Sequence, residues 1–228
     1  MDEAEIRNRR LIRQNVIERV RADQPHTGSV VACIDRIFDI SDRFHVKRSE
    51  IEADQKLSTV GRRAALAQAV RAELMPDLAK ATRPIRKALG YAASQRAGFE
   101  DPVRVDSTDH VGEMRRQELR SYLRSLQPHE RMSMANELVK EDAGAAAILD
   151  AHPALSGLQE QFYGQLRAQV AERVNGPKLT ELAGIEGDYQ QGQAAAGILL
   201  NDLVAASGLT AKAFTEEMAP LEQAADSA

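Results

Sequence analysis

The chain has 228 residues, of which 43% are hydrophobic, with five Phe, four Tyr and no Trp, and its many alanines predict helices packed closely through small side chains. The formal net charge of −4 argues against bulk binding of nucleic acid. The single cysteine, Cys33, excludes an internal disulfide and gives no sign of an oxidising compartment.

The start of the chain carries no targeting signal that we recognise. Residues 1–5 lack the basic start and apolar run of a signal peptide. No stretch reaches the roughly 20 apolar residues that cross a bilayer. We therefore expect a cytoplasmic protein without a membrane partner.

Two helices are predicted at the N-terminal end. Residues 2–21 place their apolar side chains on one helical face, and residues 23–28 contain Pro and Gly, which indicates a turn. Residues 30–54 form the second predicted helix. At its start, residues 29–34 fit a short strand as well, although the spacing of the isoleucines that follow favours a helix.

A longer helix is predicted to begin at Ser58, whose hydroxyl can accept a hydrogen bond from the free backbone amides of the first turn. It continues to residue 97 and ends at Gly98. Pro76 and Pro84 are expected to kink or interrupt it, because proline lacks the amide hydrogen that a helix uses.

Residues 99–108 have no helical period, contain Pro102 and alternate Val103 with Val105. Two interpretations fit this segment. Either it is an extended arm that separates two helical halves, or it lies across a neighbour and pairs there as a strand.

The next segments predict a helical hairpin. Residues 110–126 carry apolar side chains on one face, and Pro128 is a first-turn proline of a second helix. Two helices with almost no loop between them form a hairpin. Residues 143–149 predict a short apolar helix.

Further along, Ser156 and Gln159 match a capping box, so we expect a helix to begin at Ser156. Residues 175–177, Asn-Gly-Pro, indicate the end of that helix.

Residues 178–206 predict another helix, and its four glycines indicate either close helix contact or a loop near residues 184–187. Residues 211–223 form the last predicted helix, followed by a frayed tail.

The charge is unevenly distributed along the chain. Residues 1–100 carry 19 Lys and Arg against 14 Asp and Glu, whereas residues 101–228 carry 11 against 20. The sequence therefore predicts an all-α protein with a basic helical region at 1–98, an extended linker at 99–108 and an acidic helical region at 109–228, with an elongated shape as one option.

This asymmetry suits head-to-tail association between copies or docking on an acidic partner. Solvated helix faces are the equally favoured alternative. The candidate interaction residues are basic side chains of the first region and large side chains of the linker: Arg62, Arg63, Arg71, Arg83, Arg86, Lys87, Phe99, Val103 and Val105.

No motif predicts a catalytic, cofactor or metal site. The five histidines lack metal-ligand spacing on any one helix, and neither a P-loop nor a dinucleotide-binding motif occurs. Cys33 lies among apolar residues and is expected to be a small core residue. We therefore expect no cofactor, no metal and no enzyme activity, with a site assembled from scattered His, Asp and Arg as the remaining enzymatic option.

Two segments resemble stretches of small helical structural and assembly proteins of tailed bacteriophages and prophages. They are residues 57–66, which read Leu-Ser-Thr-Val-Gly-Arg-Arg-Ala-Ala-Leu, and residues 146–158, which include Ala-Ile-Leu, Pro153 and Leu-Ser-Gly-Leu. The resemblance, which continues from residue 66 to residue 78, implies a virion-associated or assembly protein, such as a head-to-tail adaptor, a connector component or a scaffold. The acidic C-terminal region argues against a scaffold.

The leading hypothesis is therefore a non-enzymatic structural or assembly protein that acts as an oligomer, such as a tailed-phage adaptor, located in the bacterial host cytoplasm or incorporated in a virion. The alternative is a nucleic-acid-associated helical regulator that uses its Arg-rich helices. Five arginines of the predicted hairpin would then face duplex phosphate: Arg115, Arg116, Arg120, Arg124 and Arg131.

Overall fold

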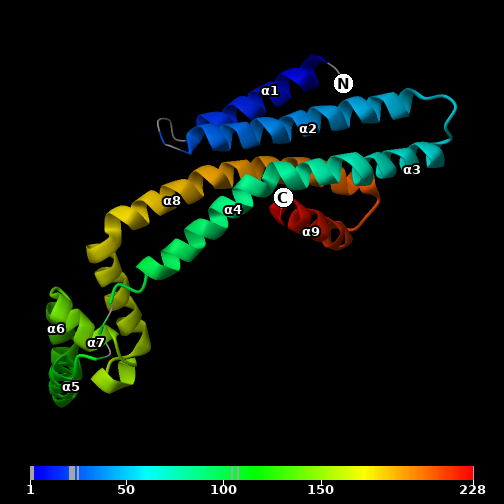
Figure 1. The fold of residues 1–228 in the computed structure, drawn as a ribbon. Helices are drawn as coiled ribbons and strands as arrows, with labels where there is room; N and C mark the ends of the chain where they lie inside the picture. Colours follow the sequence, from blue (N-terminus) through cyan, green and yellow to red (C-terminus); the bar gives the residue numbers. More distant parts are fainter. Residues whose placement is uncertain (1–2, 21–23, 25, 104, 107, 228) are drawn as a thin grey trace. The chain divides into compact units, whose positions relative to one another are not determined.

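The computed structural model describes residues 3–20, 24, 26–103, 105–106 and 108–227, and these residues contain helices and no strand. The all-α prediction is confirmed. The α-helices, in chain order (Figure 1), are α1 (Glu3–Glu18), α2 (Thr27–Ala53), α3 (Thr59–Ala69), α4 (Met75–Phe99), α5 (His110–Ser125), α6 (Pro128–Leu138), α7 (Asp142–Leu149), α8 (Glu160–Ser207) and α9 (Ala211–Ser227). Positions 2 and 21 of the first predicted helix, 23 and 25 of the predicted turn, and 104 and 107 of the predicted linker lie outside the described residues.

The chain forms two compact units that differ from the predicted division. The first unit combines Met1–Ala92 with Gly184–Ala228, and the second is Ala93–Ala183. The boundary differs because apolar side chains of residues 184–228 complete the core of the first unit instead of packing with residues 109–183. The predicted linker belongs to the second unit.

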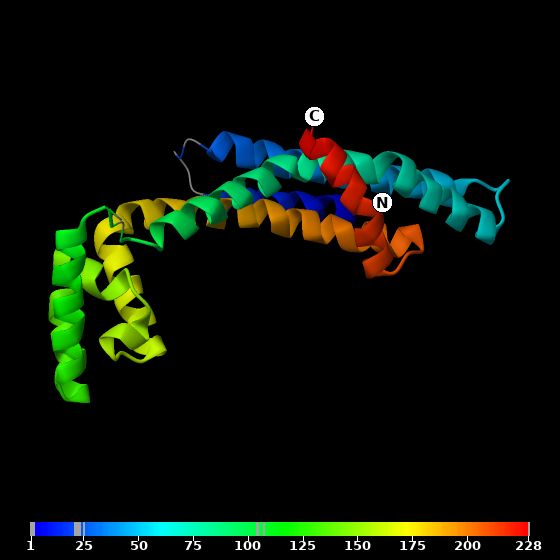
Figure 2. The same cartoon turned by 60° about the horizontal axis from the view of Figure 1, so that its bottom comes forward.

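The core of the first unit is centred on α2. Val30, Ile34, Ile37 and Phe44 lie along one face of this helix and are buried. α1 lies along α2 in both views (Figures 1 and 2). Residues 29–34 are helical, so the strand alternative was wrong, and burial raises the pKa of the Cys33 thiol, as a core position predicts.

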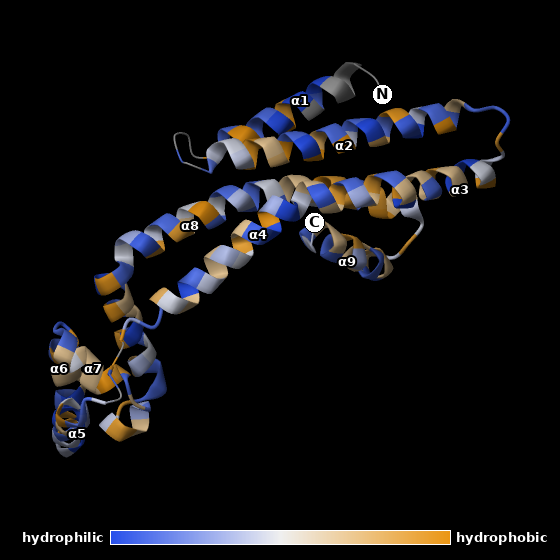
Figure 3. Ribbon diagram, in the orientation of Figure 1, coloured by the Kyte–Doolittle hydropathy of each residue, from blue (hydrophilic) through white to orange (hydrophobic). Residues whose placement is uncertain are grey.

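The side chains that complete this core come from distant parts of the sequence. Leu78 and Ile85 of α4, Leu199 and Leu203 of α8, and Phe214 of α9 are all buried in the same cluster as α2. Hydrophobic and hydrophilic residues alternate along α2 and α8 (Figure 3), as expected for helices with one buried face.

The long helix predicted after Ser58 begins as expected, and its α-helical hydrogen bonding is interrupted next to one of its two prolines. Ser58 Oγ accepts a hydrogen bond from the Gly61 amide at 3.1 Å. A π-helical segment, Val70–Leu74, then ends directly before Met75 and Pro76, and the Met75 amide donates to the Val70 carbonyl. Such wide turns accommodate an irregularity of hydrogen bonding inside a helix. Pro84 lies inside α4 without ending it.

The second unit contains the predicted hairpin of α5 and α6. Asp109 Oδ1 accepts a hydrogen bond from the Gly112 amide at 2.8 Å and caps α5. Pro128 is in the first turn of α6, where a capping box joins Gln127 and Glu130. The core of this unit gathers apolar side chains of α5 to α8: Leu123, Val139, Ile148, Leu158, Leu166 and Val170.

Three local predictions in the second half were wrong. Ser156 does not begin a helix, because it ends a 3₁₀ turn, Pro153–Ser156, after which Gly157 turns the chain with a φ of 67°. The helix does not end near Pro177, because α8 continues through it with Val170 and Leu182 buried on either side. The last helix does not end at residue 223, since α9 runs to Ser227.

Candidate interaction site

Arg86, one of the predicted interaction residues, holds α9 against α4. Its Nη2 donates to Asp226 Oδ1 at 2.8 Å, and its Nη1 lies 3.2 Å from Glu222 Oε1 and 2.7 Å from Thr82 Oγ1. The hydrogen bond from Arg86 holds the pKa of Asp226 below its ordinary value. Arg86 therefore serves the fold of the first unit.

A second ion pair repeats this arrangement. Arg71 Nε lies 3.3 Å from Glu217 Oε2, so basic residues before and within α4 face acidic residues of α9. The basic and acidic parts of the sequence thus meet partly inside one unit, which weakens the interpretation of the asymmetry as a head-to-tail device.

The remaining predicted arginines and lysine of this region are spread apart. Arg62 Nε donates to the Asp54 carbonyl at 3.1 Å. Arg63 is exposed and lines a cavity of about 320 Å³ together with Phe44 and Leu66. Lys87 is exposed on α4. These three side chains do not form one site.

Arg83, in contrast, lines a groove with two further cations. The α4–α9 groove, as we call it, has a volume of about 480 Å³ and is bordered by Arg36 of α2 and by Lys80 and Arg83 of α4. Apolar side chains of α4 and α9 form its remaining lining: Pro76, Pro84, Leu221, Ala224 and Ala225. Sequence reasoning found Arg83 but missed Arg36 and Leu221, because no local pattern links three helices that are far apart in the chain.

Arg83 is unusual because its Nε is buried and finds no hydrogen-bond acceptor among the described residues. Leaving a buried donor unpaired costs about 1–3 kcal/mol. The charge of Arg83 acts on the Asp226 carboxylate, which is itself bonded to Arg86. The groove therefore contains a cation whose bonding capacity the described part of the chain does not use.

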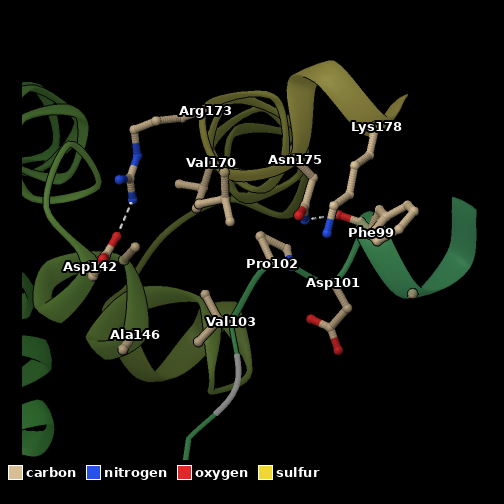
Figure 4. A pocket seen from close by; sticks show the side chains of 13 residues that line it. Phe99, Asp101, Pro102, Val103, Asp142, Ala146, Val170, Arg173, Asn175 and Lys178 are labelled. Carbon is tan, nitrogen blue, oxygen red and sulfur yellow. Dashed lines mark hydrogen bonds and ion pairs between the residues drawn. The ribbon is translucent and has the colours of Figure 1, made fainter. Parts of the chain in front are cut away.

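Two of the three predicted linker residues line a second cavity, within the second unit. This cavity of about 500 Å³ is lined by Phe99 and Val103, and by Arg173, Asn175 and Lys178 of α8 (Figure 4). Asn175 Nδ2 donates to the Phe99 carbonyl at 3.0 Å, and Lys178 Nζ lies 5.1 Å from the centre of the Phe99 ring.

The segment is thus attached to its own unit. Arg167 Nε donates to the Glu100 carbonyl at 3.1 Å, Val103 packs against the second core, and Val105 is half-buried. In the described part of the segment we find no strand. Opposite charges also face each other in the cavity, where Arg173 Nη2 lies 2.8 Å from Asp142 Oδ1.

Most arginines of the hairpin are used internally. Arg131 donates to the carbonyls of Leu123, Arg124 and Leu126 at 2.9, 3.1 and 2.9 Å, and to that of Gly157 at 2.6 Å. The first three carbonyls lie at the C-terminal end of α5, where a helix leaves its last carbonyls unpaired. Arg131 therefore caps α5 and ties it to the 3₁₀ turn.

Three other arginines of the hairpin also bond within the second unit. Arg120 is 5% exposed and donates to the Ala147 carbonyl at 3.0 Å. Arg116 Nε donates to Glu113 at 3.0 Å, which lowers the pKa of that carboxyl, and Arg124 donates to a carbonyl of the 3₁₀ turn. With these guanidinium groups engaged, the geometry does not favour the nucleic-acid alternative.

Across the described ranges, no group of three or more His, Cys, Asp or Glu side chains is placed to hold a metal ion. No single helix in those ranges is long and apolar enough to cross a membrane, and α8 with α9 meet the criteria of length and composition only as a pair bent by 110°. Comparison with protein-family models, curated proteins and solved structures finds no match to this chain.

Proposed function

We propose that this chain is a non-enzymatic structural or assembly protein that acts as an oligomer through protein–protein contacts. The observation that carries the proposal is a stripe of large apolar side chains on α5. Val111, Met114 and Tyr122 are 62%, 64% and 47% exposed. We call these three residues the α5 stripe.

The α5 stripe lies on the solvent side of a helix whose opposite side is well packed. Its members are spaced at three and eight residues, which places them on one helical face. Leu123 and Arg120, on the other side of α5, are buried. Grouped exposed apolar side chains commonly mark a protein contact, whereas single ones do not. A contact surface of this kind is what an assembly protein requires.

The resemblance of residues 57–66 and 146–158 to proteins of tailed phages supports a narrower form of the proposal. In that form the chain is a virion component such as a head-to-tail adaptor, made in the cytoplasm of a bacterial host and working beside other structural proteins. No cofactor or metal takes part in this role.

The test is the oligomeric state of the full chain, measured by size-exclusion chromatography with light scattering over a range of concentrations. We expect an oligomer that Met114→Glu dissociates, since a buried unpaired carboxylate is costly at an interface. Val60→Glu is the matched control, because Val60 is 77% exposed outside the stripe. A wild-type chain that stays monomeric throughout, or an oligomer equally sensitive to both substitutions, would contradict the proposal.

A further inference from the structure

We propose that the α4–α9 groove binds an acidic amphipathic segment of a partner protein. This inference rests on the proposed function, because it names the partner chemistry of an assembly protein. It starts from three cations, Arg36, Lys80 and Arg83, that border a groove with an otherwise apolar lining.

The lining of the groove carries a net positive charge because it contains three cations and no carboxylate. Carboxylates close to the groove are held mostly by cations outside its lining. Asp77 Oδ2 lies 2.7 Å from Arg43 Nη2, whereas its Oδ1 lies farther, 4.0 Å, from Lys80 Nζ. Asp39 lies 3.6 Å from Arg13. Glu222 and Asp226 are held by Arg86, as described above.

In the described part of the chain, two of the three bordering cations, Arg36 and Arg83, are free to bind a ligand, whereas Lys80 also lies near Asp77. Within the described ranges, Arg36 and Arg83 have no carboxylate within ion-pair distance, and Arg83 Nε lacks an acceptor. Guanidinium groups bind carboxylates through paired hydrogen bonds that an ammonium group does not reproduce. A carboxylate-bearing ligand therefore matches the polar half of the groove.

The apolar half restricts the ligand further. Leu221, Ala224 and Pro84 offer no hydrogen-bonding side chain, so a ligand peptide without apolar side chains would bury polar groups there without hydrogen-bond partners, which is unfavourable. A second hollow of about 270 Å³ shares Arg36 and Lys80, and in it Ile40 and Ala81 lie among charged side chains that include Asp39, Arg43 and Asp77. A smaller apolar surface therefore continues along α2 and α4.

The size of the groove also fits a short helical segment. Pro76 and Pro84 are eight residues apart on α4, which corresponds to about 12 Å of helix. This length matches roughly two turns of a docked helix with apolar residues facing the groove and acidic residues facing its cations, a common mode of peptide recognition. A phosphate backbone has the charge but not the apolar face.

The experiment measures binding of a fluorescent peptide of about 12 residues, with Leu and Glu at helical spacing, to the full chain by anisotropy. Lys80→Glu is the first variant and Lys87→Glu its control, because both lysines are exposed on α4 and only Lys80 lines the groove. We expect Lys80→Glu to weaken binding by at least about tenfold, and Lys87→Glu by less than about threefold.

A second pair of variants tests the α9 side of the groove. Ala224 lines the groove and Ala219 does not, although both are exposed residues of α9. Ala224→Glu should abolish binding by placing a carboxylate among the cations, whereas Ala219→Glu should leave the affinity unchanged. Circular dichroism checks that each variant is folded.

Several results would overturn the inference. The first is that the wild-type chain does not bind the peptide, and the second is that Lys80→Glu and Lys87→Glu weaken binding equally. The third is that a polyglutamate peptide without leucine binds as tightly as the Leu and Glu peptide. The fourth is that duplex DNA binds more tightly than the peptide and depends on Lys80. The Met114→Glu variant separates the two proposals. Peptide binding retained by a dissociated Met114→Glu chain supports both, and an oligomer that depends on Met114 but binds no peptide overturns the groove alone.

Discussion

His26 Nε2 lies 2.6 Å from Asp188 Oδ2, and these two residues join the beginning of α2 to α8 across 162 positions of sequence. The Asp188 side chain is 3% exposed and that of His26 is 15% exposed. The ring of Tyr189 stacks on the imidazole with 5.9 Å between centroids. A carboxylate this deeply buried requires a polar partner, and the imidazole provides one.

Removing His26 should therefore destabilise the first unit. We expect His26→Ala to lower the free energy of unfolding by about 3 kcal/mol, because it leaves the Asp188 carboxylate with one partner fewer in a buried site. Chemical denaturation followed by circular dichroism measures this change. His129→Ala, at an exposed position, should have almost no effect, and an equal loss in both variants would contradict the role of the pair.

Arg131 should be the most important cation of the second unit. We expect Arg131→Ala to lower its free energy of unfolding by about 2–4 kcal/mol, since several carbonyls lose their donor at once. Arg115→Ala is the control, because Arg115 is an exposed arginine of α5. Hydrogen exchange of amides in α5 and in the 3₁₀ turn locates the effect, and unchanged protection in Arg131→Ala would contradict the capping role.

Gly144 brings the start of α7 close to the end of α6. A Cβ added there would lie 2.1 Å from the Leu138 carbonyl oxygen, whereas one at Gly164 of α8 would meet no atom within 4 Å. We expect Gly144→Ala to destabilise the second unit by about 2 kcal/mol through this clash. Gly164→Ala should stabilise it by up to about 1 kcal/mol, because alanine favours the helix. Thermal denaturation measures the change in Tm of each variant. If the close approach is real, Gly144→Ala lowers the Tm and Gly164→Ala raises it.

Local signals in the sequence predicted most of the helices. Ser58 and Pro128 are examples, because a capping hydroxyl and a first-turn proline act through atoms within a few residues. The same reasoning gave wrong predictions at Ser156, where we expected a helix to begin, and at Pro177, where we expected one to end. The residues around Ser156 form a 3₁₀ turn closed by Gly157, and the helix around Pro177 persists where buried side chains on both sides favour it.

The candidate site was less predictable for a different reason. Charge clustering identified Arg83, and it also identified Arg86, which the fold uses internally. The two arginines differ because α9 packs against α4. Asp226 of α9 pairs with Arg86, whereas Leu221 of α9 lines the groove beside Arg83. Pairings across more than 130 residues leave no trace in local periodicity.

The first unit is discontinuous in sequence, with Ala93–Ala183 inserted between its two parts. A ribosome therefore completes the inserted unit while the first unit still lacks Leu199, Leu203 and Phe214, the side chains that close its core. Because domains generally fold as units during synthesis, the inserted unit should fold before the first unit, although its residues follow those of the first unit's N-terminal part. The N-terminal helices must then wait until the last part of the chain supplies Asp188 for His26 and the α9 carboxylates for Arg86.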